Sequence, residues 1–204
     1  REALMAVSKA RLAAVVTAAA VVAAVATLLV LGTGNPLRST ASYKALVGGP
    51  FTMTTQDGKR LSERDLLGKP FAVFFGFTQC PDVCPTTMLE VANMMTRLGP
   101  DADKMRFLFV TVDPDRDTPA LLKSYLASFD KRIIGLVGTA AETERIVKAY
   151  RVFYEKVPTK AGYTINHTAT MFLMDAQGQF AKTIAFKEDE KIKLSKLKAL
   201  IAGR

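Results

Sequence analysis

Two continuous apolar runs in the middle of the chain constrain the fold more than any other feature. Residues 71–75 and 107–112 lack any alternation of polar and apolar side chains, which is typical of strands covered on both faces. The segment between them, 86–98, carries apolar residues at helical spacing. A buried strand, a helix and a second buried strand form a parallel βαβ unit, so the sequence predicts an α/β fold.

The rest of the C-terminal part alternates between shorter strands and helices. Residues 51–61 indicate a hairpin closed at Asp57-Gly58, a dipeptide that favours tight turns between strands. Further elements are expected at 119–129 (helix), 140–150 (helix, after a short strand), 171–174 and 180–186 (antiparallel strands) and 187–202 (amphipathic helix with Ile192 facing inward). This order predicts a thioredoxin-like fold over residues 49–204, with a central mixed sheet flanked by helices and an extra N-terminal β-hairpin.

An apolar segment near the N-terminus suggests that the chain is tied to a membrane. Residues 12–31 carry no charge, and a helix of about 20 residues is long enough to cross the hydrocarbon core of a bilayer. The alternative is a cleaved signal peptide, but its apolar region is shorter, about 7–15 residues, and is followed by a small-residue cleavage site. We therefore expect one uncleaved transmembrane helix at 12–31 and a linker of small and polar residues at 32–48.

The charges on either side of this segment indicate its orientation. Basic residues precede it closely, whereas the first basic residues after it are Arg38 and Lys44. The positive-inside rule then leaves residues 1–11 in the cytoplasm, so we expect a single-pass protein of the bacterial inner membrane with its C-terminal domain in the periplasm. The formal net charge is +9, but the basic residues are scattered without interleaved aromatic residues, so nucleic acid is not an expected partner.

The only two cysteines stand between the first buried run and the helix after it, in Phe77-Thr78-Gln79-Cys80-Pro81-Asp82-Val83-Cys84-Pro85. Proline favours the first position of a helix, which puts Cys84 about at the N-cap and Cys80 in the loop before it. A helix N-terminus favours anions and lowers the pKa of a thiol placed there. The pair can hold a metal, exchange electrons as a redox-active disulfide, or form a structural disulfide around a small loop.

His167, the only histidine of the chain, is the third candidate. It precedes the predicted strand 171–174, in a loop that in thioredoxin-like folds packs against the active-site cysteines. Two thiolates and one neutral imidazole form a soft set of donors that favours copper or zinc. Because a structural zinc site uses four protein ligands and only three strong candidates are present, we favour copper at Cys80, Cys84 and His167.

Three segments resemble the motifs of one known family, the SCO/SenC copper proteins. They are 75–85 with both cysteines, 113–119 (DPDRDTP) and 163–168 (YTINHT), in the order that the family has. The resemblance covers about residues 49–202. It departs from the common pattern at Phe77, where tyrosine is common, and at Asn166 and Thr168, where aspartate and serine are common. None of these departures removes a candidate ligand.

This resemblance implies a membrane-tethered, thioredoxin-fold copper chaperone that helps to assemble the dinuclear copper centre of cytochrome c oxidase. Position by position, it implies that Cys80, Cys84 and His167 are the copper ligands. The implied partners are the copper-receiving subunit of the oxidase and another periplasmic copper chaperone. Copper would pass to the cysteines of the partner by ligand substitution, which requires reduced thiols on both sides. Such a protein is a metallochaperone rather than an enzyme.

A thiol–disulfide oxidoreductase is the alternative that the residues leave open. In that function, Cys80 and Cys84 are a redox-active pair that keeps the cysteines of a partner reduced. A peroxidase related to peroxiredoxins agrees less well with the sequence, because no arginine stands near the cysteines along the chain to bind a peroxide.

Three other groups have both a structural and a functional interpretation, and we favour the structural one for each. Residues 113–118 form a turn and a helix cap, or a carboxylate patch near copper. Asp82 is an exposed turn residue, or it offers an oxygen atom to Cu(II). The lysines of the last helix form a solvated face, or they dock to an acidic surface. These are Lys187, Lys191, Lys193, Lys196 and Lys198.

Overall fold

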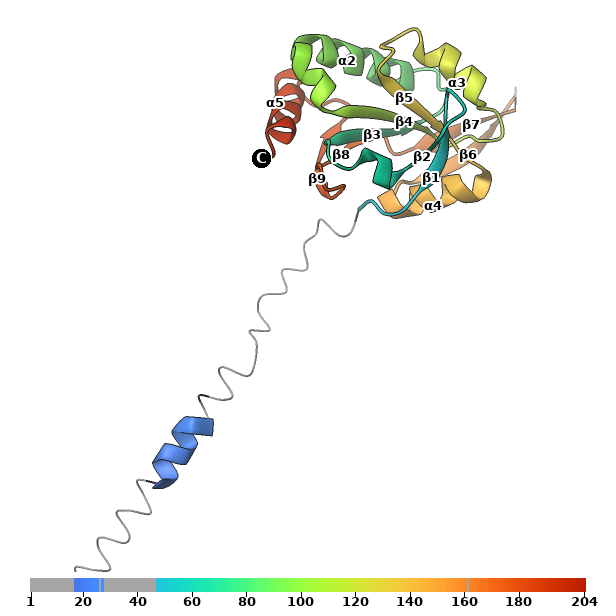
Figure 1. Cartoon of the computed structure of the whole chain (residues 1–204). Helices are drawn as coiled ribbons and strands as arrows, with labels where there is room; N and C mark the ends of the chain where they lie inside the picture. The colour runs from blue at the N-terminus through green and yellow to red at the C-terminus, as the bar shows by residue number, and fades with distance from the viewer. Residues whose placement is uncertain (1–16, 26, 28–46, 161) are drawn as a thin grey trace, which may run out of the picture. The chain divides into compact units, whose positions relative to one another are not determined.

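The structure is a computed structural model that describes residues 17–25, 27, 47–160 and 162–204 (Figure 1). The chain divides into two compact units, Arg1–Ser42 and Tyr43–Arg204. The described residues of the first unit are helical.

The predicted cytoplasmic segment 1–11 lies outside the described residues, and so do most of the predicted span 12–31 and of the predicted linker 32–48. Within the part of the chain that the structure describes, no helix combines the length and the hydropathy needed to span a bilayer.

The second unit is built on a seven-stranded mixed sheet. Its strands are β1 (Thr52–Thr55), β2 (Arg60–Ser62), β3 (Phe71–Gly76), β4 (Arg106–Thr111), β5 (Ile133–Val137), β8 (Thr170–Met174) and β9 (Phe180–Ala185). Their order across the sheet is β2-β1-β5-β4-β3-β8-β9. The three central strands β3, β4 and β5 are parallel, and the outer pairs are antiparallel. This is the predicted mixed sheet, with the predicted hairpin β1–β2 at one edge.

Helices cover both faces of the sheet. They are α2 (Val83–Leu98), α3 (Pro119–Leu126), α4 (Ala140–Tyr150) and α5 (Glu190–Ile201), with short 3-10 helices η3 (Glu63–Leu66) and η4 (Gly99–Lys104) before β3 and β4. Figure 1 shows α2 and α3 on one face and α4 on the other. The C-terminal helix α5 packs against α2 and against the edge strand β9.

Neighbouring residues of β3 show how both faces are filled. The ring of Phe74 packs with that of Phe109, which in turn contacts Tyr125 of α3. The ring of Phe75 points the other way and lies 5.3 Å from that of Tyr150 of α4. All of β3 is buried. The continuous apolar run therefore forms a strand that is covered on both faces of the sheet, as predicted.

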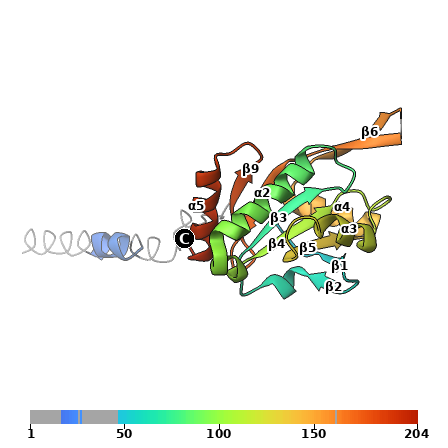
Figure 2. The same ribbon diagram turned by 90° about the horizontal axis from the view of Figure 1, so that it is seen from above.

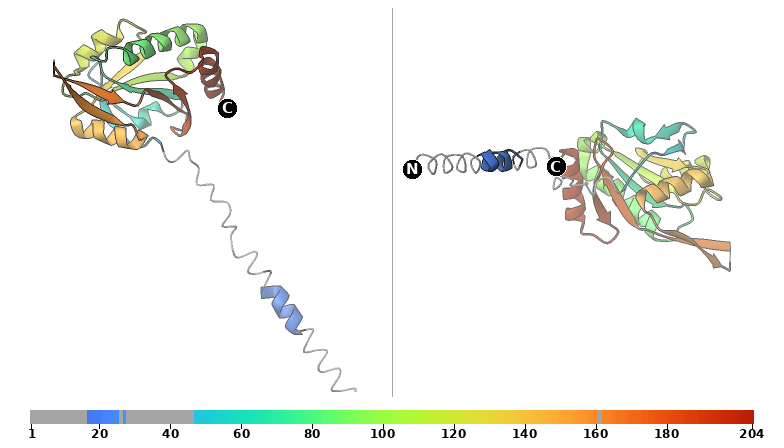
Figure 3. Two further views of the ribbon diagram at one scale, coloured as in Figure 1. Left: turned by 180° about the vertical axis from the view of Figure 1, so that it is seen from behind. Right: turned by 90° about the horizontal axis from the view of Figure 1, so that it is seen from below.

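A separate two-stranded ribbon was not predicted. Strands β6 (Tyr154–Thr159) and β7 (Gly162–His167) pair only with each other, and Figures 2 and 3 show the ribbon projecting from the rest of the unit. Most of β6 is exposed and it contains Pro158, so it has no apolar pattern that would mark a strand. The predicted loop around His167 is therefore wrong, because His167 is the last residue of β7.

The C-terminal helix is shorter than predicted, and one of its side chains was placed wrongly. Ile192 was expected to face inward but is 50% exposed. Leu194, Leu197 and Leu200 face the core, and Lys193 is buried with them. The spacing of apolar residues in a helix does not determine exactly which residues at the edges of its buried face are covered.

Candidate metal centre

The three residues predicted as ligands are brought together. One donor atom each from Cys80, Cys84 and His167 lie within 4.8 Å of one another. The Sγ atom of Cys84 is 3.5 Å from Nε2 of His167. Both cysteines are free thiols; Cys84 is buried, whereas Cys80 is partly exposed. The loop before α2, the first turn of α2 and the end of the ribbon therefore combine into a group that can hold a metal ion.

The start of α2 differs from the prediction by two residues. Asp82 is the N-cap and Val83 the first helical residue, so Cys84 lies inside the first turn rather than at the N-cap. Pro85 is accommodated because N–H groups of the first turn have no partner within the helix. The free N–H of Cys84 donates to Sγ of Cys80 at 3.4 Å, which directs the helix N-terminus at that sulfur.

The two thiols differ in acidity. The hydrogen bond from the Cys84 thiol is the main reason why the pKa of Cys80 is lowered to about 4, and the hydrogen bond from the Cys84 amide acts in the same direction. The pKa of Cys84 is raised because its thiol donates this hydrogen bond, because it is buried and because the Cys80 charge is close. The reduced, metal-free pair thus holds one thiolate, at Cys80. A metal ion that binds both sulfurs must release the Cys84 proton.

His167 is oriented for ligation. Its Nδ1 lies 3.1 Å from the carbonyl oxygen of Thr168, which can only accept, so Nδ1 carries the proton of the neutral ring. This leaves the lone pair of Nε2 facing Cys84. The rings of Phe74 and Phe77 meet the imidazole edge-on, with centroids 6.1 and 5.8 Å away. Packing and one hydrogen bond therefore fix both the tautomer and the direction of the ring.

A glycine at the end of β3 makes room for the buried sulfur. A Cβ atom added to Gly76 would lie 2.8 Å from Sγ of Cys84 and 3.0 Å from the ring of Phe109. Both distances are shorter than a normal contact, so Cys84 occupies its position only because residue 76 has no side chain.

Two buried carboxylates connect the segment after β4 to the cysteine loop and to the ribbon. Asp117 accepts hydrogen bonds from the N–H and the hydroxyl of Thr78, at 3.1 and 2.6 Å, and from the hydroxyl of Thr111 at 2.5 Å. Asp113 accepts a bond from the hydroxyl of Tyr163 at 2.7 Å. Both carboxylates are fully buried, so they do not form a surface patch near the metal centre. Thr118 caps α3, as predicted.

Arg116 joins three segments around the metal centre. Its Nε donates to Asp113, and its Nη1 donates to Oε1 of Gln79 at 3.0 Å and to the carbonyl oxygen of Tyr163 at 2.8 Å. The guanidinium carbon also lies 3.8 Å from the centre of the Tyr163 ring. Gln79 precedes Cys80, and Tyr163 stands on the same strand as His167, so Arg116 ties the cysteine loop to the ribbon.

These contacts of Arg116 and Tyr163 were not predicted from the sequence. The motif 113–119 was noticed, but its residues were interpreted as a turn and a cap. Asp82 was interpreted as an exposed turn residue, and it is exposed at the start of α2, where its Oδ1 lies 3.5 Å from the hydroxyl of Thr86. It does not belong to the donor group found among the described residues.

Several known proteins are similar to this chain in sequence and in fold. A copper-bound ScoI structure from Bradyrhizobium japonicum is 45% identical, with a TM-score of 0.71, over 76% of this chain and 99% of that one. The copper-bound yeast Sco1 structure is 34% identical, also with a TM-score of 0.71, over 78% of this chain and 90% of that one.

The mitochondrial SCO1 homolog of Homo sapiens is 36% identical over 67% of this chain and 47% of its own length. The mitochondrial SCO1 of Saccharomyces cerevisiae is 37% identical over 76% of this chain and 54% of its own length. The chain thus spans about half the length of these curated relatives. The family model described as SCO1/SenC matches residues 39–202, which include both cysteines and the histidine. The chain belongs to the SCO1/SenC family.

Proposed function

We propose that this protein is a copper-binding metallochaperone that assists assembly of the dinuclear copper centre of cytochrome c oxidase. The observation that carries the proposal is the convergence of Cys80, Cys84 and His167, with donor atoms within 4.8 Å. Two sulfurs and an imidazole nitrogen suit copper, and copper-bound structures exist for similar chains of this family.

The acidity and the exposure of the donors support a cargo site. Cys80 is already a thiolate, so only Cys84 has to lose a proton when copper binds. Cys80 is also the partly exposed sulfur, which lets a thiolate of the partner approach the metal from that side. Copper then moves by stepwise substitution of one ligand for another, without a free ion. The receiving partner is the copper-receiving subunit of the oxidase, and another periplasmic copper chaperone is a further partner.

A copper titration of the unit Tyr43–Arg204 tests the ligand set. We expect tight Cu(I) and Cu(II) binding by the wild type, and a large loss of Cu(II) affinity in His167→Ala. Asn166→Ala is the matched control, because Asn166 is the exposed neighbour of the histidine on the same strand. If His167→Ala binds both ions as tightly as the wild type, the three-ligand site is wrong.

Thiol–disulfide exchange is the second candidate, and the asymmetry of the two thiols favours it. The Cys80 thiolate would attack a disulfide sulfur of the substrate and form a mixed disulfide, releasing one substrate thiol. Cys84 would then lose its proton, attack Cys80 and release the second thiol. The substrate gains two electrons from the pair, one proton from Cys84 and one proton from solvent, and the Cys80–Cys84 pair becomes a disulfide.

The same His167→Ala variant separates the two functions, because it removes a predicted copper ligand and leaves both sulfurs that exchange in place. Rapid reduction of a model disulfide by a wild type that binds copper only weakly would replace the copper proposal with this one. Cys84→Ser should then accumulate the mixed disulfide on Cys80, which intact mass spectrometry detects.

We also propose that residues 12–31 anchor the protein in the bacterial inner membrane, with the domain in the periplasm. Support comes from the uncharged apolar run and from the basic residues that precede it. Membrane fractionation with alkaline extraction, followed by protease treatment of spheroplasts, tests both parts. Extraction by alkali would refute the anchor, and protection from protease in spheroplasts would refute the periplasmic location.

A further inference from the structure

The lysines of the C-terminal helix α5 fall into two classes. Lys193 is buried and donates to Glu90 and to the carbonyl oxygen of Phe186, at 2.7 and 2.9 Å. Lys196 forms an ion pair with Glu188 at 2.5 Å. These lysines hold α5 in place, so the single solvated face expected from the sequence does not exist.

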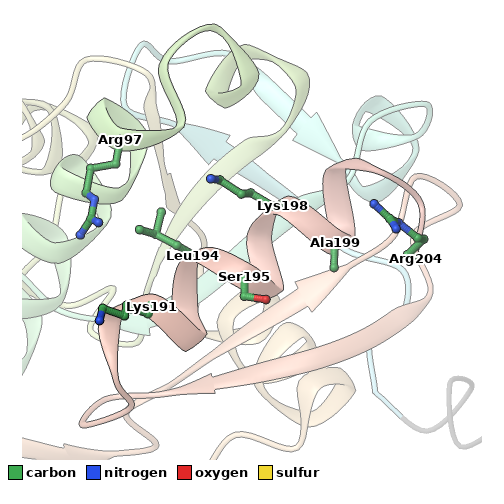
Figure 4. Close-up of a pocket in the computed structure, with 7 residues that line it drawn as sticks. All are labelled: Arg97, Lys191, Leu194, Ser195, Lys198, Ala199 and Arg204. Carbon is green, nitrogen blue, oxygen red and sulfur yellow. The ribbon is translucent and has the colours of Figure 1, made fainter.

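The other two lysines of α5, Lys191 and Lys198, line a pocket of about 570 Å³ between α5 and the end of α2. Figure 4 shows Arg97 reaching into this region from α2, with Lys191 and Lys198 on α5 and Arg204 just after it. The remaining lining residues are Leu194, Ser195 and Ala199. Every charged side chain that lines the pocket is therefore basic. We call it the basic pocket.

Three of the four cations are not neutralised. Arg97 forms an ion pair with Glu190. Lys191, Lys198 and Arg204 have no ion-pair partner among the residues that the structure describes. Gathering like charges around one hollow costs free energy, and an anion bound there offsets this cost. The apolar side chains of Leu194 and Ala199 leave part of the lining suited to carbon atoms next to the anionic group.

The basic pocket and the candidate metal centre lie at opposite ends of α2. Cys84 is in the first turn of this helix and Arg97 in its last. At about 1.5 Å of rise per residue, the two positions are about 20 Å apart along the helix axis. A surface bound at the basic pocket therefore leaves the cysteine end of α2 directed away from that surface.

We propose that the basic pocket binds phosphate headgroups of an anionic bilayer and so orients the domain with its metal centre away from the membrane. The proposal rests on the proposed anchor at 12–31 and not on the copper function. A bilayer is favoured over an acidic protein because the predicted linker 32–48, at up to about 3.4 Å per residue, lets the pocket reach the membrane. Cations near an anionic leaflet also add their attractions, each about fivefold in binding.

Vesicle binding by the unit Tyr43–Arg204 tests this proposal. Two similar solved chains are matched over 99% of their length by 76% and 78% of this chain. A domain of this kind therefore folds without an N-terminal segment. Co-sedimentation uses vesicles of phosphatidylcholine alone or with phosphatidylglycerol. We expect binding only with the anionic lipid, weakened by salt. The double variant Lys191→Gln/Lys198→Gln should bind about 30-fold more weakly.

The matched control is Lys59→Gln/Lys131→Gln, which removes two exposed lysines far from α5 in the sequence and the same net charge. It should lose less than about threefold, because only general attraction changes. An equal loss of binding in both double variants would show that net charge, and not the basic pocket, binds the vesicles. Equal binding to neutral and anionic vesicles, or no binding to anionic vesicles, would refute the proposed contact with an anionic membrane. Inorganic phosphate that shifts the amide NMR signals of α5 without vesicle binding would identify a free anion instead.

Discussion

Arg116 gives the sharpest test of how the metal centre is held. Its ion pair with Asp113 is not a surface pair, because the side chain of Asp113 is 0% exposed and that of Arg116 only 21%. In Arg116→Ala, the buried carboxylate of Asp113 keeps the hydrogen bond from the hydroxyl of Tyr163 but loses the guanidinium that balances its charge. Removing one partner of a buried pair typically costs about 3–5 kcal/mol, against about 0–1 kcal/mol for an exposed pair. We therefore expect the free energy of unfolding to fall by about 3–5 kcal/mol.

Urea denaturation of the unit Tyr43–Arg204 measures this loss. The control is Arg132→Ala, which removes ion pairs from a more exposed arginine, 37% accessible, and should cost about 1 kcal/mol or less. The double variant Asp113→Asn/Arg116→Ala should be more stable than Arg116→Ala, because no charge is left buried without a partner. A loss under about 1 kcal/mol in Arg116→Ala, or no recovery in the double variant, would refute this account.

The same substitution should also weaken copper binding, although Arg116 is not a candidate ligand. Its contacts with Gln79 and Tyr163 fix the segments that carry Cys80 and His167. Losing a residue that orients metal ligands typically costs about 10–100-fold in affinity. Titrations without denaturant should show this loss in Arg116→Ala and not in Arg132→Ala. Unchanged copper affinity would mean that the ribbon holds His167 without help from the guanidinium.

Three further predictions concern single groups. Gly76→Ala should cost about 1–3 kcal/mol of stability and weaken copper binding, since the new Cβ would lie 2.8 Å from Sγ of Cys84; unchanged urea midpoints would contradict it. In the reduced, metal-free protein, iodoacetamide should modify Cys80 at a rate that is constant from pH 8 down to pH 5 and falls only as the pH approaches about 4; a rate that rises with a midpoint near pH 9 would contradict the lowered pKa. Tyr125→Phe should leave stability unchanged or higher, because the buried hydroxyl of Tyr125 has no hydrogen-bond partner among the described residues; a loss above about 1 kcal/mol would contradict it.

The parts of the fold that were predicted from the sequence are those with a strong local signal. The run at 71–75 has no polar residue, and the structure places it in the centre of the sheet with aromatic contacts on both faces. The cysteine pair before a helix, and the place of His167 just before a strand of the predicted thioredoxin-like fold, together predicted that the three residues would meet.

The parts that were missed depend on partners far away in the chain. Strand β6 is exposed along most of its length, so only its pairing with β7 makes it a strand. The burial of Asp113 depends on Arg116 and on Tyr163, 50 residues later. Lys193 is buried because Glu90 meets it from α2, which no periodicity within α5 reveals.

The candidate metal ligands lie on two parts of the domain that are hydrogen-bonded separately, and these parts differ in local stability. Cys84 belongs to a helix packed on the seven-stranded sheet, whereas His167 belongs to a ribbon whose strands pair only with each other. The ribbon can open by giving up its own ladder and the contacts at its base, while the sheet stays closed. Amide hydrogens of β7 should therefore exchange with solvent through a smaller opening than those of β3. The free energy needed to displace the imidazole is therefore that of opening the ribbon, which is smaller than the free energy of unfolding the whole domain.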